Sequence, residues 1–320
     1  MRENLFILIG PTAIGKTELS INLAKKLDGE IISADSMQIY KYMDIGTAKI
    51  KVNEMGCITH YLIDIIYPDD EYTVANYQRD ASKLITDINM KNKLPIVVGG
   101  TGLYINSLVY NLNFTKVPPN DVYRQELEVL ADSYGDSYLH DKLAEVDLES
   151  SKTININDRK RIIRALEVYK VTGKTISEYN KDFRREVDKY NLYMMCLNMD
   201  RRKLYDRINR RVDTMIEEGL VDEVQSILNR GYNKSLISLK GIGYKEIIMY
   251  LEGDITLDEA IDKIKQGSRN YAKRQLTWFR RDTRIKWINK DDFEDFYELS
   301  NYIYNHVKDI FNNSNKEGLK

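Results

Sequence analysis

The sequence predicts an α/β protein in which helices flank a parallel sheet and an all-helical insertion interrupts the chain. Up to about residue 110, short apolar runs alternate with helically spaced apolar residues, the pattern of a parallel doubly wound sheet. From about 115 to 190 only helical patterns occur, so this segment is the expected insertion. With 320 residues, the chain is long enough for a main domain and an added one.

A glycine-rich loop follows the first expected strand, residues 5–9. It fits the pattern G-x-x-x-x-G-K-[ST], whose backbone N–H groups cradle phosphates. Its residues are Gly10, Pro11, Thr12, Ala13, Ile14, Gly15, Lys16 and Thr17. Lys16 supplies a positive charge, the Thr17 hydroxyl is placed to hold Mg²⁺, and a helix with apolar residues from Leu19 to Leu27 follows. This context predicts a P-loop NTPase-like sheet that binds a polyphosphate or pyrophosphate.

A second expected strand, residues 30–36, brings Asp35 to its carboxyl end. In open α/β sheets, ligands bind beyond the carboxyl ends of the strands, so Asp35 should face the same crevice as the P-loop. A carboxylate there can bind Mg²⁺, cap a helix or accept a proton from a substrate, and the residues alone leave these roles open. The polar turn at residues 44–49 could line the same crevice.

The next two expected strands are residues 60–66 and 95–98, with an amphipathic helix over residues 74–88 between them. The later strand ends in two glycines and Thr101, whereas many P-loop ATPases have an acidic residue there that holds Mg²⁺. This difference weakens the ATPase interpretation and puts the Thr101 hydroxyl near the phosphates.

Pro118 and Pro119 indicate a domain boundary. The predicted domains are a P-loop-type α/β core with C-terminal helices, residues 1–115 and 190–320, and a helical insertion, residues 116–189. Within the insertion, helices are expected at residues 121–132, 137–146, 157–171 and about 175–183.

The core is expected to resume with a strand at residues 193–197. Two helices that end at Gly219 and Gly231 follow, and then a long helix over about residues 256–281 that opens with a capping box. A last short strand is expected at residues 285–288.

The cysteine content and the lengths of the apolar runs indicate the cellular compartment and the kinds of partner. The two cysteines are far apart and form no CxxC pair, which favours a reducing compartment over a disulfide framework or a structural zinc site. No apolar run approaches the ~18 residues of a membrane span, so the sequence predicts a cytoplasmic protein with no membrane partner. The polar tail, residues 312–320, is expected to be disordered.

Basic residues cluster, although the net charge is only −1. They gather in residues 159–164, 201–211 and 269–286, the last with interleaved aromatic side chains. Each run alone fits a solvated helix face, whereas three runs beside a phosphate site favour a long polyanion laid across one face. Arg207 and Arg211, four residues apart on one helix, could instead close over the P-loop ligand.

Several stretches, in order, resemble the bacterial form of the tRNA dimethylallyltransferase family, which is also called the tRNA isopentenyltransferase or IPP transferase family. They are residues 10–17, 33–40, 43–49, 97–104, 157–167, 241–246 and 272–279. Many enzymes share the P-loop, but the Ala-Asp-Ser, Gly-Gly-Thr-Gly-Leu-Tyr and Ala-Lys-Arg-Gln-Leu-Thr-Trp stretches are much more specific. The sequence departs from the family pattern at Ile14, Tyr42 and Ile50, none of which has a proposed catalytic role.

The resemblance implies transfer of the dimethylallyl group of dimethylallyl diphosphate to N6 of the adenosine 3′-adjacent to the anticodon, position 37. The tRNAs would be those that read codons beginning with U. The implied catalytic residues are Asp35, Thr101, Lys16 and Arg207. Asp35 would act as general base, the two cations would stabilise the departing diphosphate, and Thr101 would lie where the substrates meet. The P-loop and Arg211 would bind the diphosphate, and Thr17 would bind the expected cofactor, Mg²⁺.

The resemblance also implies that the partner is the anticodon stem-loop of tRNA and that the insertion grips the stem. The corresponding tRNA-binding positions are Asp35, Ser36, Met37, Gln38, Thr101, Arg124, Arg159, Lys160, Arg161, Ile162, Ile163, Lys240, Gly241, Ile242, Gly243, Tyr244, Lys245, Lys273, Arg274, Gln275, Trp278 and Arg281. A monomer is expected. The alternatives are a P-loop small-molecule or nucleoside kinase that uses ATP, and a non-catalytic RNA-binding protein with a relic P-loop.

Overall fold

The computed structural model describes residues 2–112, 120–179 and 185–317. The chain divides into two compact units, Met1–Leu108 with Asp188–Lys320, and Val109–Val187. The sequence-based boundaries were placed a few residues later, at 115/116 and 189/190. The boundary prediction at Pro118 and Pro119 lies outside the described residues.

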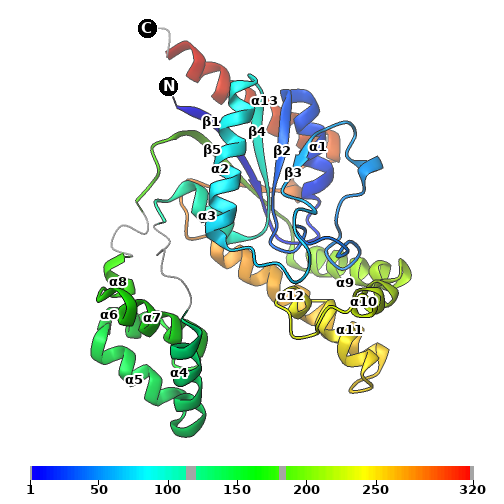
Figure 1. The fold of residues 1–320 in the computed structure, drawn as a ribbon. Coiled ribbons are helices and arrows are strands. Elements are labelled where there is room, and N and C mark those ends of the chain that lie inside the picture. Colours follow the sequence, from blue (N-terminus) through cyan, green and yellow to red (C-terminus); the bar gives the residue numbers. More distant parts are fainter. Residues whose placement is uncertain (1, 113–119, 180–184, 318–320) are drawn as a thin grey trace. The chain divides into compact units, whose positions relative to one another are not determined.

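The first unit is built on a six-stranded parallel sheet with the strand order β3-β2-β4-β1-β5-β6 (Figure 1). Its strands are β1 (Glu3–Ile9), β2 (Gly29–Ala34), β3 (His60–Tyr61), β4 (Leu94–Gly99), β5 (Tyr190–Asn198) and β6 (Lys286–Asn289). The register places Leu8 of β1 between Val98 of β4 and Met195 of β5. The loop after β1 therefore leaves the sheet between two neighbouring strands, and the predicted α/β class is confirmed.

Strand β3 is shorter than the sequence predicts. Of the expected residues 60–66, only His60 and Tyr61 pair with β2. Leu62 and Asp64 have φ values of 61° and 55°, and this left-handed conformation ends the extended pairing. The Asp64 carboxylate accepts a hydrogen bond from Lys49 Nζ at 2.5 Å, so this segment serves an ion pair rather than the sheet.

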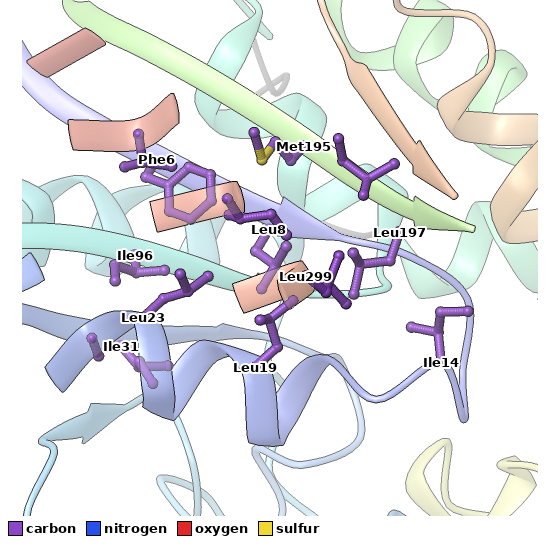
Figure 2. Packing of buried hydrophobic residues seen from close by; sticks show 14 of the residues in the cluster. Phe6, Leu8, Ile14, Leu19, Leu23, Ile31, Ile96, Met195, Leu197 and Leu299 are labelled. Carbon is purple, nitrogen blue, oxygen red and sulfur yellow. The ribbon is translucent and has the colours of Figure 1, made fainter. Parts of the chain in front are cut away.

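Helices α1 and α13 pack on one face of the sheet. Phe6 and Leu8 of β1 point to the same face, because side chains alternate along a strand. They pack with Leu19 and Leu23 of α1 and with Leu299 of α13 in one buried cluster (Figure 2). The helices that pack against the sheet are α1 (Lys16–Leu27), α2 (Val74–Met90) and α13 (Phe296–Glu317), and α3 (Gly102–Val109) follows β4 along the chain. This core anchors β1 and α1, and thereby both ends of the P-loop.

Neither α3 nor α13 was predicted, and the disorder predicted for the tail is wrong over residues 312–317. These residues continue α13, whereas residues 318–320 lie outside the described part of the chain. Ile303 and Val307 are buried on this helix. Once packed residues have nucleated a helix, adding further residues costs little, so a polar sequence can continue it.

Four helices gather at the end of the sheet where β1, β2 and β4 finish (Figure 1). They are α9 (Arg201–Glu217), α10 (Leu220–Asn229), α11 (Tyr244–Leu251) and α12 (Leu257–Phe279), of which α11 was not predicted. A second buried cluster joins Tyr40 and Met43, from the segment after β2, to Val212, Val224 and Tyr244 of these helices. The helices thus hold the segment after β2 against the carboxyl edge of the sheet.

The second unit is helical, as predicted, with its own core of Leu127, Leu139, Leu143 and Ile162. Its helices are α4 (Asp121–Tyr134), α5 (Asp136–Val146), α6 (Leu148–Thr153), α7 (Arg159–Thr172) and α8 (Ile176–Tyr179). Helix α6 was not anticipated. Residues 180–183 of the last predicted helix lie outside the described residues.

Candidate active site

The P-loop turns sharply between β1 and α1. Gly15, at the start of the helix, has a φ of 96°, a conformation that a side chain would strain. Lys16 folds back over the loop, and its Nζ donates hydrogen bonds to the carbonyls of Gly10 and Pro11, each at 2.9 Å. The lysine charge is therefore held against the loop.

A pocket of about 590 Å³, the phosphate pocket, lies beside the loop. Its walls are Thr12, Ala13, Gly15, Lys16, Thr17, Asp35, Gln38, Thr47, Val98, Gly99, Gly100, Arg207, Arg210, Arg211, Thr214, Tyr271 and Gln275. Within this described lining, four side chains are cationic and Asp35 is the one carboxylate. The excess of positive charge beside backbone N–H groups suits a polyphosphate.

Two of these cations have lowered pKa values. Burial lowers the pKa of Lys16 to about 8, opposed by Asp35 and reinforced by the charge of Arg211. Burial also lowers the pKa of Arg211, and the neighbouring Arg207 acts in the same direction. A bound polyanion would favour the charged forms of both side chains.

A second pocket, of about 400 Å³, adjoins the phosphate pocket. The two pockets share Thr12, Ala13, Asp35, Thr47, Arg211 and Tyr271. The adjoining pocket has an apolar side made by Ile208, Val212, Met215, Ile242 and Ile264, and also reaches Lys240, Lys245 and Arg274. An apolar or planar group could enter it while cations hold an attached anionic chain.

Asp35 follows β2 directly and lies where the two pockets meet. Its Oδ1 accepts a hydrogen bond from the backbone N–H of Met37 at 2.9 Å, so it caps a tight turn and starts no helix. The same carboxylate lines both pockets, and the turn fixes its direction. Asp64, by contrast, lines neither pocket and pairs with Lys49.

Thr101 supports this turn from the end of the neighbouring strand β4. Its Oγ1 accepts a hydrogen bond from Ser36 N at 3.0 Å, and its N–H donates to the carbonyl of Ala34 at 3.1 Å. Thr101 is absent from the described lining of both pockets, whereas Tyr271 lines both. Burial raises the pKa of Tyr271 to about 12, and Asp35 contributes to the shift, so Tyr271 is a neutral hydroxyl beside the carboxylate.

Two of the predicted tRNA-binding residues on α12, Gln275 and Trp278, make close contacts within the protein. Gln275 is buried, accepts a hydrogen bond from Thr12 N at 2.9 Å and donates one to the Gly100 carbonyl at 3.0 Å. A Cβ on Gly102 would lie 2.3 Å from the Trp278 ring. The glycines after β4 are thus required because α12 packs directly on them. The remaining predicted cations of this helix region, Lys273, Arg274 and Arg281, are exposed.

The loop before α11 is only partly open to a ligand. Lys240 and Lys245 are exposed, whereas Gly243 and Tyr244 are buried. The Tyr244 hydroxyl donates to Glu223 at 2.7 Å, so it is occupied within the protein. All six predicted residues of this loop and of the first turn of α11 nevertheless line the adjoining pocket: Lys240, Gly241, Ile242, Gly243, Tyr244 and Lys245.

The predicted arginines of the helical unit are paired with carboxylates. Arg124 Nε donates to Glu167 Oε1 at 2.8 Å. Arg159 contacts three acidic side chains, which raise its pKa: Glu128, Asp132 and Asp136. Both arginines therefore stabilise this unit.

Ile162 and Ile163 also belong to the core of that unit, with exposed fractions of 0% and 4%. Their side chains face inward on α7, so a contact of these two positions with tRNA would have to involve the backbone. Lys160 and Arg161 are exposed on the same helix. Lys160 and Arg161 are therefore the most accessible of the predicted contacts in this stretch.

Besides Tyr271, two further side chains near the first unit's site were not among the predicted site residues. Lys290 Nζ donates to the Ile14 carbonyl of the P-loop at 3.0 Å. Glu223 accepts hydrogen bonds from the backbone N–H groups of residues 44–46, at 2.7 to 3.1 Å. No local motif marks either residue. The parallel-strand rule could have placed Lys290 at the correct edge, since it directly follows β6.

Among the described residues, no group of three or more His, Cys, Asp and Glu side chains could hold a metal ion. The same part of the chain has no helix long and apolar enough to cross a membrane.

The fold and the site define an enzyme class, a P-loop-type transferase with two adjoining pockets beside the loop. The family model described as IPP transferase matches residues 38–282. The chain therefore belongs to the IPP transferase family.

Solved structures agree with this assignment. The full-length tRNA isopentenylpyrophosphate transferase from Bacillus halodurans is 45% identical, with 100% of both chains covered and a TM-score of 0.75. The tRNA delta(2)-isopentenylpyrophosphate transferase from Staphylococcus epidermidis is 41% identical, with 96% of this chain and 100% of that chain covered and a TM-score of 0.71. A eukaryotic dimethylallyltransferase acting on tRNA is 28% identical, with 97% of this chain and 80% of that chain covered and a TM-score of 0.83.

Proposed function

We propose that this protein transfers the dimethylallyl group of dimethylallyl diphosphate to N6 of adenosine 37 in tRNAs that read codons beginning with U. One observation carries the proposal: Asp35 is the carboxylate common to the phosphate pocket and the adjoining pocket. A donor whose diphosphate occupies the first pocket and an adenine that enters from the second would meet at this side chain.

The chemistry requires three events. The C1–O bond of the donor breaks, and its electron pair leaves with the diphosphate. The adenine N6 forms a bond to C1, and N6 then loses a proton. Lys16, Arg207 and Arg211 line the pocket where negative charge develops on the leaving group. Asp35 accepts the N6 proton, a general-base role typically worth ~10²–10⁴-fold in rate.

Mg²⁺ is the proposed cofactor. The Thr17 side chain is exposed at the start of α1 and lines the phosphate pocket, and Asp35 is the nearby carboxylate. This oxygen donor set suits Mg²⁺, which binds through few protein ligands together with substrate phosphates and water. When bound, the ion would neutralise part of the charge on the departing diphosphate.

The proposed partner is the anticodon stem-loop of tRNA. Lys240 and Arg274 line the adjoining pocket and are exposed, so they can contact phosphates around an adenine that enters it. Extruding the stacked base costs roughly a few kcal/mol, which these contacts would offset. Lys160 and Arg161 are the candidate contacts of the helical insertion. A cytoplasmic monomer remains a sequence-based prediction.

The alternative function, an ATP-dependent small-molecule or nucleoside kinase, has less support. Strand β4 ends in Gly99 without the acidic residue that holds Mg²⁺ in many P-loop ATPases. Membership of the IPP transferase family also gives the kinase no support.

The test is nucleoside mass spectrometry of unmodified tRNA with A36-A37-A38 in the anticodon loop. The tRNA is incubated with the protein, Mg²⁺ and either dimethylallyl diphosphate or ATP. A dimethylallyl mass increment on adenosine, seen only with the prenyl donor, is the expected result. ATP turnover without any mass increment would favour the kinase. Binding of tRNA without modification would favour a non-catalytic RNA-binding protein with a relic P-loop.

A further inference from the structure

Two cations from distant parts of the chain bind consecutive carbonyls of the P-loop. Arg207 Nε donates to the Ala13 carbonyl at 2.8 Å. Lys290 Nζ donates to the Ile14 carbonyl at 3.0 Å. The two cations come from α9 and from the residues that follow β6, so separate elements hold neighbouring peptide groups.

This arrangement fixes the direction of the loop's hydrogen-bond donors. A trans peptide is planar, and its C=O and N–H point to opposite sides. When the Ile14 carbonyl points at Lys290, the N–H of Gly15 must point away from it. Hydrogen bonds to a carbonyl also polarise the peptide and make its N–H a stronger donor. Lys290 thereby directs and strengthens a donor that a phosphate-binding loop requires.

Lys290 does this from outside the pocket. It is absent from the described lining of the phosphate pocket, whereas Arg207 is part of it. Lys290 is half-buried and lies 3.1 Å from the position that a Cβ on Gly15 would occupy. Its charge is thus close to the loop backbone.

The residue after Lys290 ties the same segment to helix α9. Asp291 accepts a hydrogen bond from Asp200 N at 2.6 Å and one from Lys203 Nζ at 2.6 Å. Asp200 is the N-cap of α9, the helix that carries the pocket arginines. The two-residue segment 290–291 therefore connects the P-loop to the start of this helix.

We propose that Lys290 is a positioning residue for diphosphate binding, which acts on the ligand through the P-loop backbone and not by direct contact. This inference deepens the proposed function, because the ligand would be the diphosphate of the prenyl donor. It does not depend on the acceptor, since inorganic pyrophosphate has the same phosphate chemistry.

The experiment compares Lys290→Met with the wild type by calorimetric titration of Mg²⁺ and inorganic pyrophosphate. Loss of a charge-assisted hydrogen bond should weaken pyrophosphate binding by about tenfold or more. Lys290→Arg, which keeps the charge and the donor, should recover most of the affinity. Lys83→Met, an exposed lysine of α2, is the matched control and should bind like the wild type.

A second readout separates positioning from general damage. In the absence of a donor, tRNA affinity of Lys290→Met should stay within about twofold of the wild type. Unchanged pyrophosphate affinity, or a parallel loss of tRNA affinity, would overturn the inference. If Lys290→Met does not fold, Lys290→Gln takes its place under the same criteria. Pyrophosphate binding tests Lys290 even if the wild type fails to prenylate tRNA, so the two failures are distinguishable.

Discussion

The side-chain amide of Gln275 accepts a hydrogen bond from the backbone N–H of Thr12 at 2.9 Å, across 263 residues of sequence. The same amide donates to the Gly100 carbonyl, so one side chain joins the P-loop to the end of β4. Helix α12 is therefore part of the wall of the phosphate pocket and not only a basic surface.

Gln275→Leu should destabilise the protein, because it leaves the Thr12 N–H and the Gly100 carbonyl without their partner. We expect a loss of about 1–3 kcal/mol in the free energy of unfolding, and a higher KM for the prenyl donor. Urea denaturation and donor titrations measure both effects. Gln266→Leu, at an exposed position of α12, is the control. Equal behaviour of the two variants would contradict this role.

Asp35→Asn should separate chemistry from binding. The amide keeps the size of the carboxylate but cannot accept the N6 proton, so kcat should fall by ~10²–10⁴-fold. Affinity for tRNA, measured by filter binding, should change little. Asp69→Asn, at an exposed position outside both pockets, should leave kcat unchanged. Near-normal turnover of Asp35→Asn would remove Asp35 as the base.

Donor binding should depend on pH through Lys16. Because burial lowers the pKa of Lys16 to about 8 in the free protein, the side chain loses its charge as the pH rises through this value. The diphosphate favours the charged form, so donor affinity should be full below pH 8 and fall above it, by at most about tenfold per pH unit. KM for the donor from pH 7 to 9.5 tests this sign. Lys16→Arg should show a flatter profile, and a flat wild-type profile would exclude the effect.

Glu223→Gln should disturb the turn at residues 44–46, whose N–H groups all point at this carboxylate. The amide nitrogen of glutamine would face backbone donors, so the turn would lose at least one acceptor. We expect about 1–3 kcal/mol less stability and a higher KM for tRNA, because Gly46 lines the adjoining pocket. Asp222→Asn, exposed on the same turn of α10, should lack both effects.

Arg274→Ala should weaken tRNA binding through a phosphate contact. Arg274 is exposed and lines the adjoining pocket. Its guanidinium carbon lies 5.7 Å from the centre of the Tyr271 ring. Loss of one phosphate contact should lower the slope of log affinity against log salt by about one. Binding at several salt concentrations measures the slope, and an unchanged slope would mean that Arg274 contacts no phosphate.

Two parts of the candidate site have local signals in the sequence. The P-loop is a contiguous motif, and Asp35 follows from the rule that parallel strands end at one edge. Contacts that link distant segments leave no local signal. Lys290 reaches Ile14 across 276 residues, and Glu223 reaches Asp44 across 179.

The remaining differences have local physical causes. An apolar run suggested a longer β3, but positive φ values at two residues end the strand. The resemblance assigned an RNA role to all of residues 159–163 of α7. Successive residues of a helix point in different directions, so only some of them can face the core. Ile162 and Ile163 therefore enter the core while Lys160 and Arg161 remain exposed.

The reach of Gln275 and Lys290 back to the P-loop also sets an order of events during synthesis. The loop leaves the ribosome 263 to 276 residues before the side chains that complete its surroundings. At about 5–20 residues per second, the nascent chain waits on the order of tens of seconds with this pocket unfinished. Truncated mRNAs that end before the codons of α12 would therefore yield chains that carry the P-loop but lack a competent donor site.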